Sequence, residues 1–370
     1  MGVARMLDHL VGFFSLYAHL PSVPHPDTLS QIEAYYHLPR EVMFPDPPAH
    51  PALEERRTVR QLTYRRQTLV GESAHRAIHP AYQERHDTEY ARNKTLWARR
   101  ITPHFRRNKD LLIYVHGWMQ PGALAEELVL MPWATKLFGA DIVHLDLPFH
   151  ARRKPRSSIV HGSFYWSADL VRTIEAVRQS VMDVRTLVRW ARDQGYERVG
   201  VSGVSLGGVV TMLTACAESD LDWACPLVAD INLKAALENA PILGAMRRDL
   251  TRSNLTLEKV GKILDEIGLG NYPLRMERER MLIVAAVDDL FLQPDPLLET
   301  WEKWGKPRIH WIPGAHMTIV ANMVPVWFEM NRFVRGIVPL RAAANGEAAR
   351  PEPGRARRRS RGPVPRARAA

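Results

Sequence analysis

A serine lies between two glycines in the run GVSLG at residues 203–207, which fits the pattern G-x-S-x-G. Apolar residues precede and follow this run, so the sequence predicts a strand over 198–203, a sharp turn at Ser205 and a helix over 207–218. A nucleophile on such a turn has a strained backbone, and the residues two places away must lack bulk. The pattern predicts a serine nucleophile for acyl chemistry. The alternative is a glycine-rich turn with a bystander serine.

A serine hydroxyl needs a general base, and the base needs an acid that orients it. Asp288 and Asp289 follow the apolar run MLIVAAV, and His316 follows the run RIHWIP. With Ser205, this gives the chain order serine, acid, histidine that is typical of a nucleophile on a strand–turn–helix. Leu292 would anchor the loop three residues after Asp289, which favours Asp289 as the acid and leaves Asp288 as the alternative.

Acyl transfer also needs two N–H groups for the negative charge that develops on the substrate oxygen. One belongs to the residue after the nucleophile, Leu206, and the other to the loop that follows the run LLIYVHG. We predict the backbone N–H of Trp118 as the second donor, with Met119 as the alternative. His116 in the same loop is predicted to be structural and not a base.

Apolar runs and amphipathic runs alternate along most of the chain. Continuous apolar runs are typical of strands buried on both faces, and a three-to-four-residue apolar period is typical of helices. The predicted strands are 58–70, 95–102, 111–117, 141–148, 198–203, 226–231, 281–287 and 308–313. The predicted helices in this part are 122–138, 169–193, 207–218, 295–304 and 317–335. This alternation predicts a mostly parallel central sheet with helices on both faces and a site beyond the carboxyl ends of its strands.

The formal charge of +10 would suggest a nucleic-acid-binding protein, but its distribution does not. Residues 341–370 hold nine arginines and two glutamates, which leaves a charge of only +3 for the rest. We expect this Arg-, Pro- and Ala-rich stretch to be a disordered tail, because it has no apolar periodicity. We therefore expect no specific nucleic-acid partner.

The N-terminal run MGVARMLDHLVGFFSLYAHL has an apolar centre that Arg5, Asp8 and His9 interrupt. This pattern predicts an amphipathic helix and not a signal peptide, and no apolar run approaches the ~20 residues that span a bilayer. Two cysteines, Cys216 and Cys225, make no disulfide framework. We expect a cytoplasmic protein, with peripheral membrane contact through the N-terminal helix and the basic tail as an alternative.

The runs HGW, GVSLGG, AVDD and GAH, in this order, resemble the α/β-hydrolase superfamily over roughly residues 95–335. The stretch LDLPFHARRKP, followed by a long helix and GVSGVSLGG, resembles its abhydrolase-domain-eighteen branch. The resemblance implies an α/β-hydrolase fold and a serine hydrolase with Ser205, Asp289 and His316 as its triad. The expected organisation is an N-terminal helical extension at 1–56, a hydrolase domain at 57–340 with a helical insertion at 230–279 before the acid-bearing strand, and the tail at 341–370.

Four residues near the predicted site are candidates for substrate binding. They are Phe149, Arg152, Arg153 and Trp166. The arginines could hold an anionic ester, or they could belong to a solvated loop. The apolar residues of 230–279 fit either a lid over a pocket or packing on the core.

We therefore expect a serine hydrolase that cleaves a carboxylic ester, including a lipid or anionic ester, through an acyl-enzyme. No metal and no organic cofactor is required. An acyltransferase, a thioesterase or a non-catalytic binding protein on the same fold are the alternatives, and the oligomeric state is left open.

Overall fold

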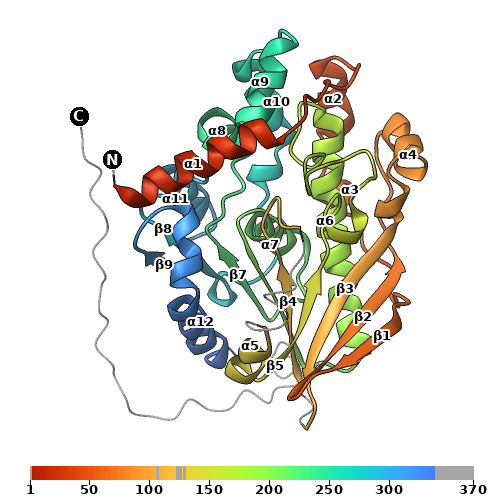
Figure 1. The fold of residues 1–370 in the computed structure, drawn as a ribbon, viewed down its shortest axis with the longest axis vertical. Coiled ribbons are helices and arrows are strands. Elements are labelled where there is room, and N and C mark those ends of the chain that lie inside the picture. The colour runs from red at the N-terminus through yellow and green to blue at the C-terminus, as the bar shows by residue number, and fades with distance from the viewer. Residues whose placement is uncertain (1, 106–107, 122–126, 128–130, 338–370) are drawn as a thin grey trace.

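A computed structural model describes residues 2–105, 108–121, 127 and 131–337 of the chain. Its centre is a nine-stranded sheet with the order β1-β2-β3-β5-β4-β6-β7-β8-β9 (Figure 1). The strands are β1 (Glu54–Arg60), β2 (Tyr64–Glu72), β3 (Thr95–Pro103), β4 (Asp110–Val115), β5 (Ala140–Leu145), β6 (Arg198–Val204), β7 (Trp223–Leu227), β8 (Leu282–Ala286) and β9 (Arg308–Ile312).

The six strands from β5 across to β9 are parallel, whereas β1, β2 and β3 are antiparallel to their neighbours. The mostly parallel sheet is thus confirmed, but two strand predictions need correction. The predicted strand 58–70 contains the end of β1, a turn and most of β2, because no glycine or proline marks the turn at residues 61–63 in the sequence. The strand predicted at 226–231 is β7, which begins at Trp223 and ends at Leu227.

Helices cover both faces of this sheet, as predicted. The α-helices are α1 (Val3–Ala18), α2 (Leu29–Tyr36), α3 (Arg40–Met43), α4 (Pro80–Asp87), α5 (Met131–Phe138), α6 (Leu170–Asp193), α7 (Leu206–Ala217), α8 (Leu233–Asn239), α9 (Gly244–Arg252), α10 (Leu257–Ile267), α11 (Pro294–Lys303) and α12 (Ile319–Arg335). Apolar residues of α6, α7 and α11 form the core on one face, and those of α5 and α12 form the core on the other. Of the helix predicted over 122–138, residues 131–138 form α5, and most of the remainder lies outside the described residues.

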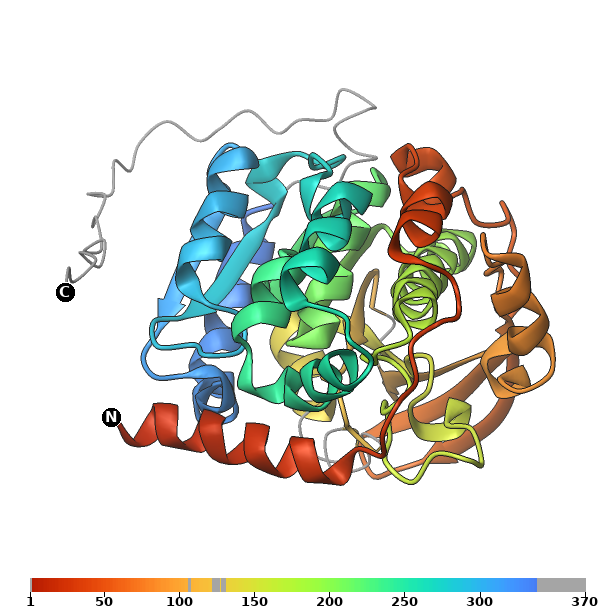
Figure 2. The ribbon, with the colours of Figure 1, turned by 90° about the horizontal axis from the view of Figure 1, so that it is seen from above.

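Helix α6 is buried on all sides, although its sequence suggests a single apolar stripe. The N-terminal segment with α2 and α3 lies along its outer side, where it contacts the polar residues of the helix (Figure 2). Tyr36 of α2 donates a 2.7 Å hydrogen bond to Glu175, and Arg178 donates to the carbonyl oxygen of Met43 at 2.9 Å. The polar face of α6 therefore packs on protein and not on water.

The segment between β7 and β8 forms α8, α9 and α10, and α1 lies beside them (Figures 1 and 2). Helix α1 packs closely on the 3₁₀ turn η4 (Pro241–Leu243) because Gly12 faces it. A Cβ atom at Gly12 would lie 2.6 Å from Cβ of Pro241, so a larger residue there would separate the two elements. The helical insertion before the acid-bearing strand is thus confirmed.

The boundaries predicted at residues 56 and 340 stay predictions, and the predicted tail 341–370 lies outside the described residues. Within the part of the chain that is described, no helix combines the length and the apolar character needed to cross a bilayer.

Candidate active site

Ser205 sits on a sharp turn between β6 and α7. Its backbone has φ 55° and ψ −117°, outside the regions that side chains other than glycine prefer. Its N–H donates to the carbonyl oxygen of Leu227 on the adjacent strand at 2.9 Å, which helps to hold this conformation. A Cβ atom at Gly207 would collide with the carbonyl oxygen of Val115, so the glycine of the motif is required by close packing on β4.

The structure brings Ser205, His316 and Asp289 together from three distant segments. His316 Nε2 lies 2.9 Å from Ser205 Oγ, and His316 Nδ1 lies 2.8 Å from Asp289 Oδ2. An ionised carboxylate only accepts hydrogen bonds, so Nδ1 carries the proton and Nε2 is free to accept one from the serine. This is the arrangement of a nucleophile, its base and an orienting acid.

The loop after β8 fixes the acid. The second oxygen of Asp289 accepts the N–H groups of Phe291 at 2.8 Å and Leu292 at 2.9 Å, and the ring of Phe291 packs on that of His316. The side chain of Asp288, in contrast, is 45% exposed and pairs with Arg5 at 3.0 Å. Of the two aspartates, Asp289 is the one in contact with the histidine.

The loop after β4 borders the nucleophile. A Cβ atom at Gly117 would lie 3.8 Å from Cβ of Ser205, and the next residues, Trp118 and Met119, line the same cavity as the serine. His116 holds this loop, since its Nδ1 donates to the carbonyl oxygen of Gly117 at 2.8 Å and its Nε2 accepts the N–H of Leu147 at 3.2 Å. Burial lowers the pKa of His116 well below its usual value, so it stays neutral, and both of its nitrogens are occupied by structural contacts.

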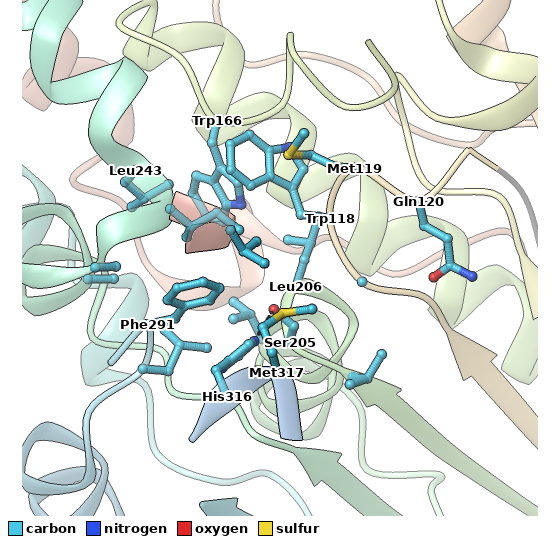
Figure 3. A pocket seen from close by; sticks show the side chains of 18 of the residues that line it. Trp118, Met119, Gln120, Trp166, Ser205, Leu206, Leu243, Phe291, His316 and Met317 are labelled. Atoms are coloured by element: carbon cyan, nitrogen blue, oxygen red, sulfur yellow. Dashed lines mark hydrogen bonds between the residues drawn. The ribbon is translucent and has the colours of Figure 1, made fainter. Parts of the chain in front are cut away.

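Ser205 and His316 open into a cavity of about 410 Å³, which is within the size range of small-molecule sites. Figure 3 shows the two side chains together, with Phe291, Leu243 and Trp166 above them. Among the described residues that line the cavity, none is Asp, Glu, Lys or Arg. The cavity therefore suits an uncharged, apolar group.

Segment 230–279 both borders the cavity and packs on the core, which are the two roles that the sequence leaves open. Leu237, Leu243 and Met246 line the cavity, whereas Leu250 and Val260 are fully buried in the core. The segment is thus a wall of the cavity that is also packed on the body of the protein.

Three of the four predicted substrate-binding residues do not line this cavity, and only Trp166 does. Phe149 is buried in the core against Tyr90. Arg153 is fully buried and pairs with Asp183 at 2.6 Å.

Arg152 is exposed, and its guanidinium lies 4.9 Å from the ring centre of Trp97. These predictions were wrong because the basic run follows the strand end by several residues. Over that distance the chain turns down onto α6 instead of continuing over the site.

Asp8 of α1 is a residue at this site that the sequence analysis did not single out. It is fully buried, and its carboxylate accepts the N–H groups of Leu290 at 3.2 Å, His316 at 3.0 Å and Met317 at 2.9 Å. One carboxylate of the N-terminal helix thus holds the loops of both the acid and the histidine. The sequence could have pointed to Asp8 through its spacing, since it shares one helix face with two small residues, Gly12 and Ser15.

One group in the described ranges brings three side chains that can bind a metal near one another: His25, Asp27 and His79. None of them lines the cavity of Ser205. Hydrogen bonds account for their contacts, since His79 Nε2 lies 2.9 Å from Asp27 and the N–H of Asp27 donates to His25 at 3.2 Å. This group is read as a polar link between the N-terminal connector and α4.

Two solved structures have an architecture similar to that of this chain. The acetyl xylan esterase from Paenibacillus sp. R4 matches 88% of this chain and 99% of its own with a TM-score of 0.56 at 13% sequence identity. Acetyl xylan esterase 1 from Thermoanaerobacterium sp. JW/SL YS485 matches 86% of this chain and 98% of its own with a TM-score of 0.50, also at 13% identity. The chain has the α/β-hydrolase fold. At these identities the likeness concerns the fold alone.

The model of the family described as alpha/beta hydrolase domain containing 18 matches residues 136–231 of this chain, and this is the branch that the sequence resembles. Uncharacterized protein Rv2627c of Mycobacterium tuberculosis (strain H37Rv) is 30% identical over 210 residues, which are 55% of this chain. The chain spans about half the length of that curated relative, 49%.

Proposed function

We propose that this α/β hydrolase is a serine hydrolase that cleaves a carboxylic ester with an uncharged, apolar acyl group. The observation that supports it is the continuous hydrogen-bonded chain from Ser205 through His316 to Asp289, which opens into an apolar cavity. Each member has the contacts that its role requires, and the strained turn exposes the serine at the end of the sheet.

In the proposed reaction, Ser205 Oγ attacks the ester carbonyl while its proton passes to His316 Nε2. Asp289 keeps the protonated imidazole in position and stabilises its charge. The N–H groups of Leu206 and Trp118 receive the oxyanion. The N–H of Leu206 is available because the first N–H groups of a helix have no partner within the helix, and that of Trp118 belongs to the loop after β4. His316 then protonates the leaving alkoxide, which departs as the alcohol and leaves an acyl-serine.

Water completes the cycle by the same steps in reverse order. His316 takes a proton from water, the resulting hydroxide attacks the acyl carbonyl, and Ser205 leaves with the proton that His316 returns. The products are a carboxylic acid and the free enzyme. Met119 remains the alternative second donor for the oxyanion, because it lines the cavity next to Trp118.

The lining of the cavity leads to a testable order of substrates. Burial of each methylene group contributes about 0.8 kcal/mol, so kcat/KM for p-nitrophenyl esters should rise about fourfold per carbon until the acyl chain fills the cavity. Omega-carboxylated acyl chains of equal length should react far more slowly, since the described residues that line the cavity include no lysine or arginine to receive the carboxylate. A preference for acetate over longer acyl groups would contradict the acyl assignment.

The serine chemistry itself is tested by a fluorophosphonate probe, which forms a covalent bond with an activated serine. We expect labelling of the folded wild-type protein and none of Ser205→Ala. Absence of labelling in a wild-type protein that unfolds cooperatively would favour a non-catalytic binding protein on this fold.

A further inference from the structure

Helix α1 has its polarity reversed with respect to a surface helix of a globular protein. The buried residues are polar or small: Asp8, Gly12 and Ser15 lie in the helix, and His19 follows it, whereas the apolar Val11 and Leu16 are only partly buried. The residues that face outward are large and apolar. In an ordinary amphipathic helix the apolar stripe faces the core and the polar stripe faces water.

The outward stripe runs the full length of the helix at the spacing of one helical face. Its members are exposed large apolar residues: Val3, Met6, Leu7, Leu10, Phe13, Phe14 and Tyr17. The three aromatic side chains are 55%, 62% and 73% exposed, respectively. A contiguous apolar patch of this kind is rare on a free protein surface and marks an interaction site.

Specific contacts fix the helix in this orientation, so the exposed stripe is not a loosely packed face. Ser15 donates a hydrogen bond to the carbonyl oxygen of Ile242 at 3.2 Å, and the ring of His19 stacks on that of Trp118. Asp8 accepts its three N–H groups from the catalytic loops on the same side. Rotating α1 to bury the apolar stripe would break all of these contacts.

The apolar surface continues past the end of the helix. Leu20, Val23 and Ile159 are exposed and line one groove there. Figures 1 and 2 both show α1 on the outside of the molecule, beside the insertion helices and with no described element beyond it. The patch is therefore an extended strip along one edge of the protein.

The charges around the strip match an anionic surface. The single acid of α1 is Asp8, which is buried, so the exposed face of the helix carries no negative charge. Residues 341–370 add nine arginines against two glutamates. The 33 residues that follow residue 337 would span about 110 Å when extended, enough to reach any side of a domain of this size.

We propose that α1 is a docking helix for an anionic lipid surface. Its outer aromatic and aliphatic side chains enter the interface between headgroups and acyl chains, and the arginines of the C-terminal stretch bind the headgroups. Val11, on the inner side of the same helix, lines the cavity of Ser205, so a docked α1 sets that cavity directly below the lipid surface.

Vesicle flotation tests this in a Ser205→Ala background, so that no lipid is hydrolysed and the result does not depend on the proposed reaction. The full-length protein should bind vesicles of phosphatidylcholine with phosphatidylglycerol more tightly than vesicles of phosphatidylcholine alone. The triple change Phe13→Ser, Phe14→Ser and Tyr17→Ser should weaken binding at least about tenfold, with an unchanged unfolding temperature.

A matched control removes exposed apolar side chains elsewhere: Leu62→Ser with Phe105→Ser, at 93% and 96% exposure, should leave vesicle binding unchanged. Equal binding by the triple variant, or no binding by the parent protein, would overturn the proposal. So would a concentration-dependent dimer in light scattering that the triple variant abolishes, since the strip would then cover a second copy of the chain.

Discussion

The cavity of Ser205 and the surroundings of α6 use buried polar groups in opposite ways. In the cavity, a serine and a histidine lie among mostly apolar side chains, and within the described part of the chain the serine hydroxyl has one hydrogen-bond partner, the histidine. Along α6, charged groups are buried in matched pairs. Examples are Arg153 with Asp183, Arg178 with Glu175, and Arg185 with Glu218.

This difference shows why a basic run is a poor guide to a binding site. A buried charge is stable only when a partner compensates its lost hydration, and a charge with such a partner has little capacity left for a substrate. Arg153 also donates to the carbonyl oxygens of Asp146 and Asn93. A group that is to react needs an unused contact, and among the described residues the hydroxyl of Ser205 has only His316 as a hydrogen-bond partner.

The largest expected effect is on activity with no change in stability. Ser205→Ala should lower ester hydrolysis by about 10⁴-fold or more, because the acyl-enzyme can no longer form. Ser202→Ala is the matched control, since Ser202 lies on the same strand and donates to the carbonyl oxygen of Cys225 at 2.7 Å. Kinetics and thermal unfolding of both variants decide this. Similar activity losses in the two would remove the contrast between reactive and structural groups.

The second-largest expected effect is a loss of stability when a buried ion pair is broken. Arg153→Ala leaves Asp183 charged and buried without its partner, which should cost about 3–5 kcal/mol in the free energy of unfolding. Replacing both members, with Arg153→Met and Asp183→Leu, should recover a large part of that loss. Urea unfolding measures it. A single variant within 1 kcal/mol of wild type would mean that water reaches this pair.

Asp230 is a third example of a buried polar group. Its carboxyl lies near the end of β7 and accepts hydrogen bonds from the N–H of Ile231 at 2.8 Å and the hydroxyl of Thr300 at 2.9 Å. Burial raises its pKa to about 6. Because this pKa exceeds the unfolded value of about 3.9, the folded state binds the proton more tightly than the unfolded state does. The stabilisation that results is complete below pH 4 and is lost as the pH rises through 6.

Loss of the proton from Asp230 should lower the free energy of unfolding by on the order of 2–3 kcal/mol between about pH 4 and pH 7. Asp230→Asn should lose that pH dependence while keeping a hydrogen-bond acceptor for Thr300. Unfolding free energies across this pH range give the comparison. Identical slopes for the two proteins would show that Asp230 is ionised throughout.

The smallest effect concerns Asp8, which links the N-terminal helix to the reactive groups. Asp8→Asn keeps one acceptor oxygen of two, so we expect kcat to fall about tenfold while KM changes little, because the cavity lining is intact. Asp288→Asn, an exposed carboxyl next to the acid, is the control and should stay within about twofold of wild type. A parallel loss of kcat and unfolding temperature in Asp8→Asn would indicate a purely structural role.

The parts of this molecule that follow from sequence are those with local causes. The turn at Ser205 needs glycines at fixed offsets, and the strand runs before Asp289 and His316 place both at the same end of a parallel sheet. Fold class and chain order were therefore readable from the residues.

The features that could not be predicted from the sequence depend on which segments pack against each other in the folded protein. Whether Arg153 meets substrate or Asp183 is decided by how its loop packs against α6, which no local pattern reports. Likewise, α1 has a polar and an apolar face in sequence, but only its docking on Pro241 makes the polar face, with Asp8, the inner one.

The hydrogen bond from His316 to Asp8 joins residues 308 positions apart. Because α1 is synthesised before the loop after β9, 308 more residues must be added before the Asp8 carboxylate can accept the N–H of His316. Until then the face of α1 that carries Asp8 is in contact with water, whereas the apolar face stays exposed even in the folded protein. The loops that carry Asp289 and His316 therefore gain their link to α1 only after both segments of the chain have been made.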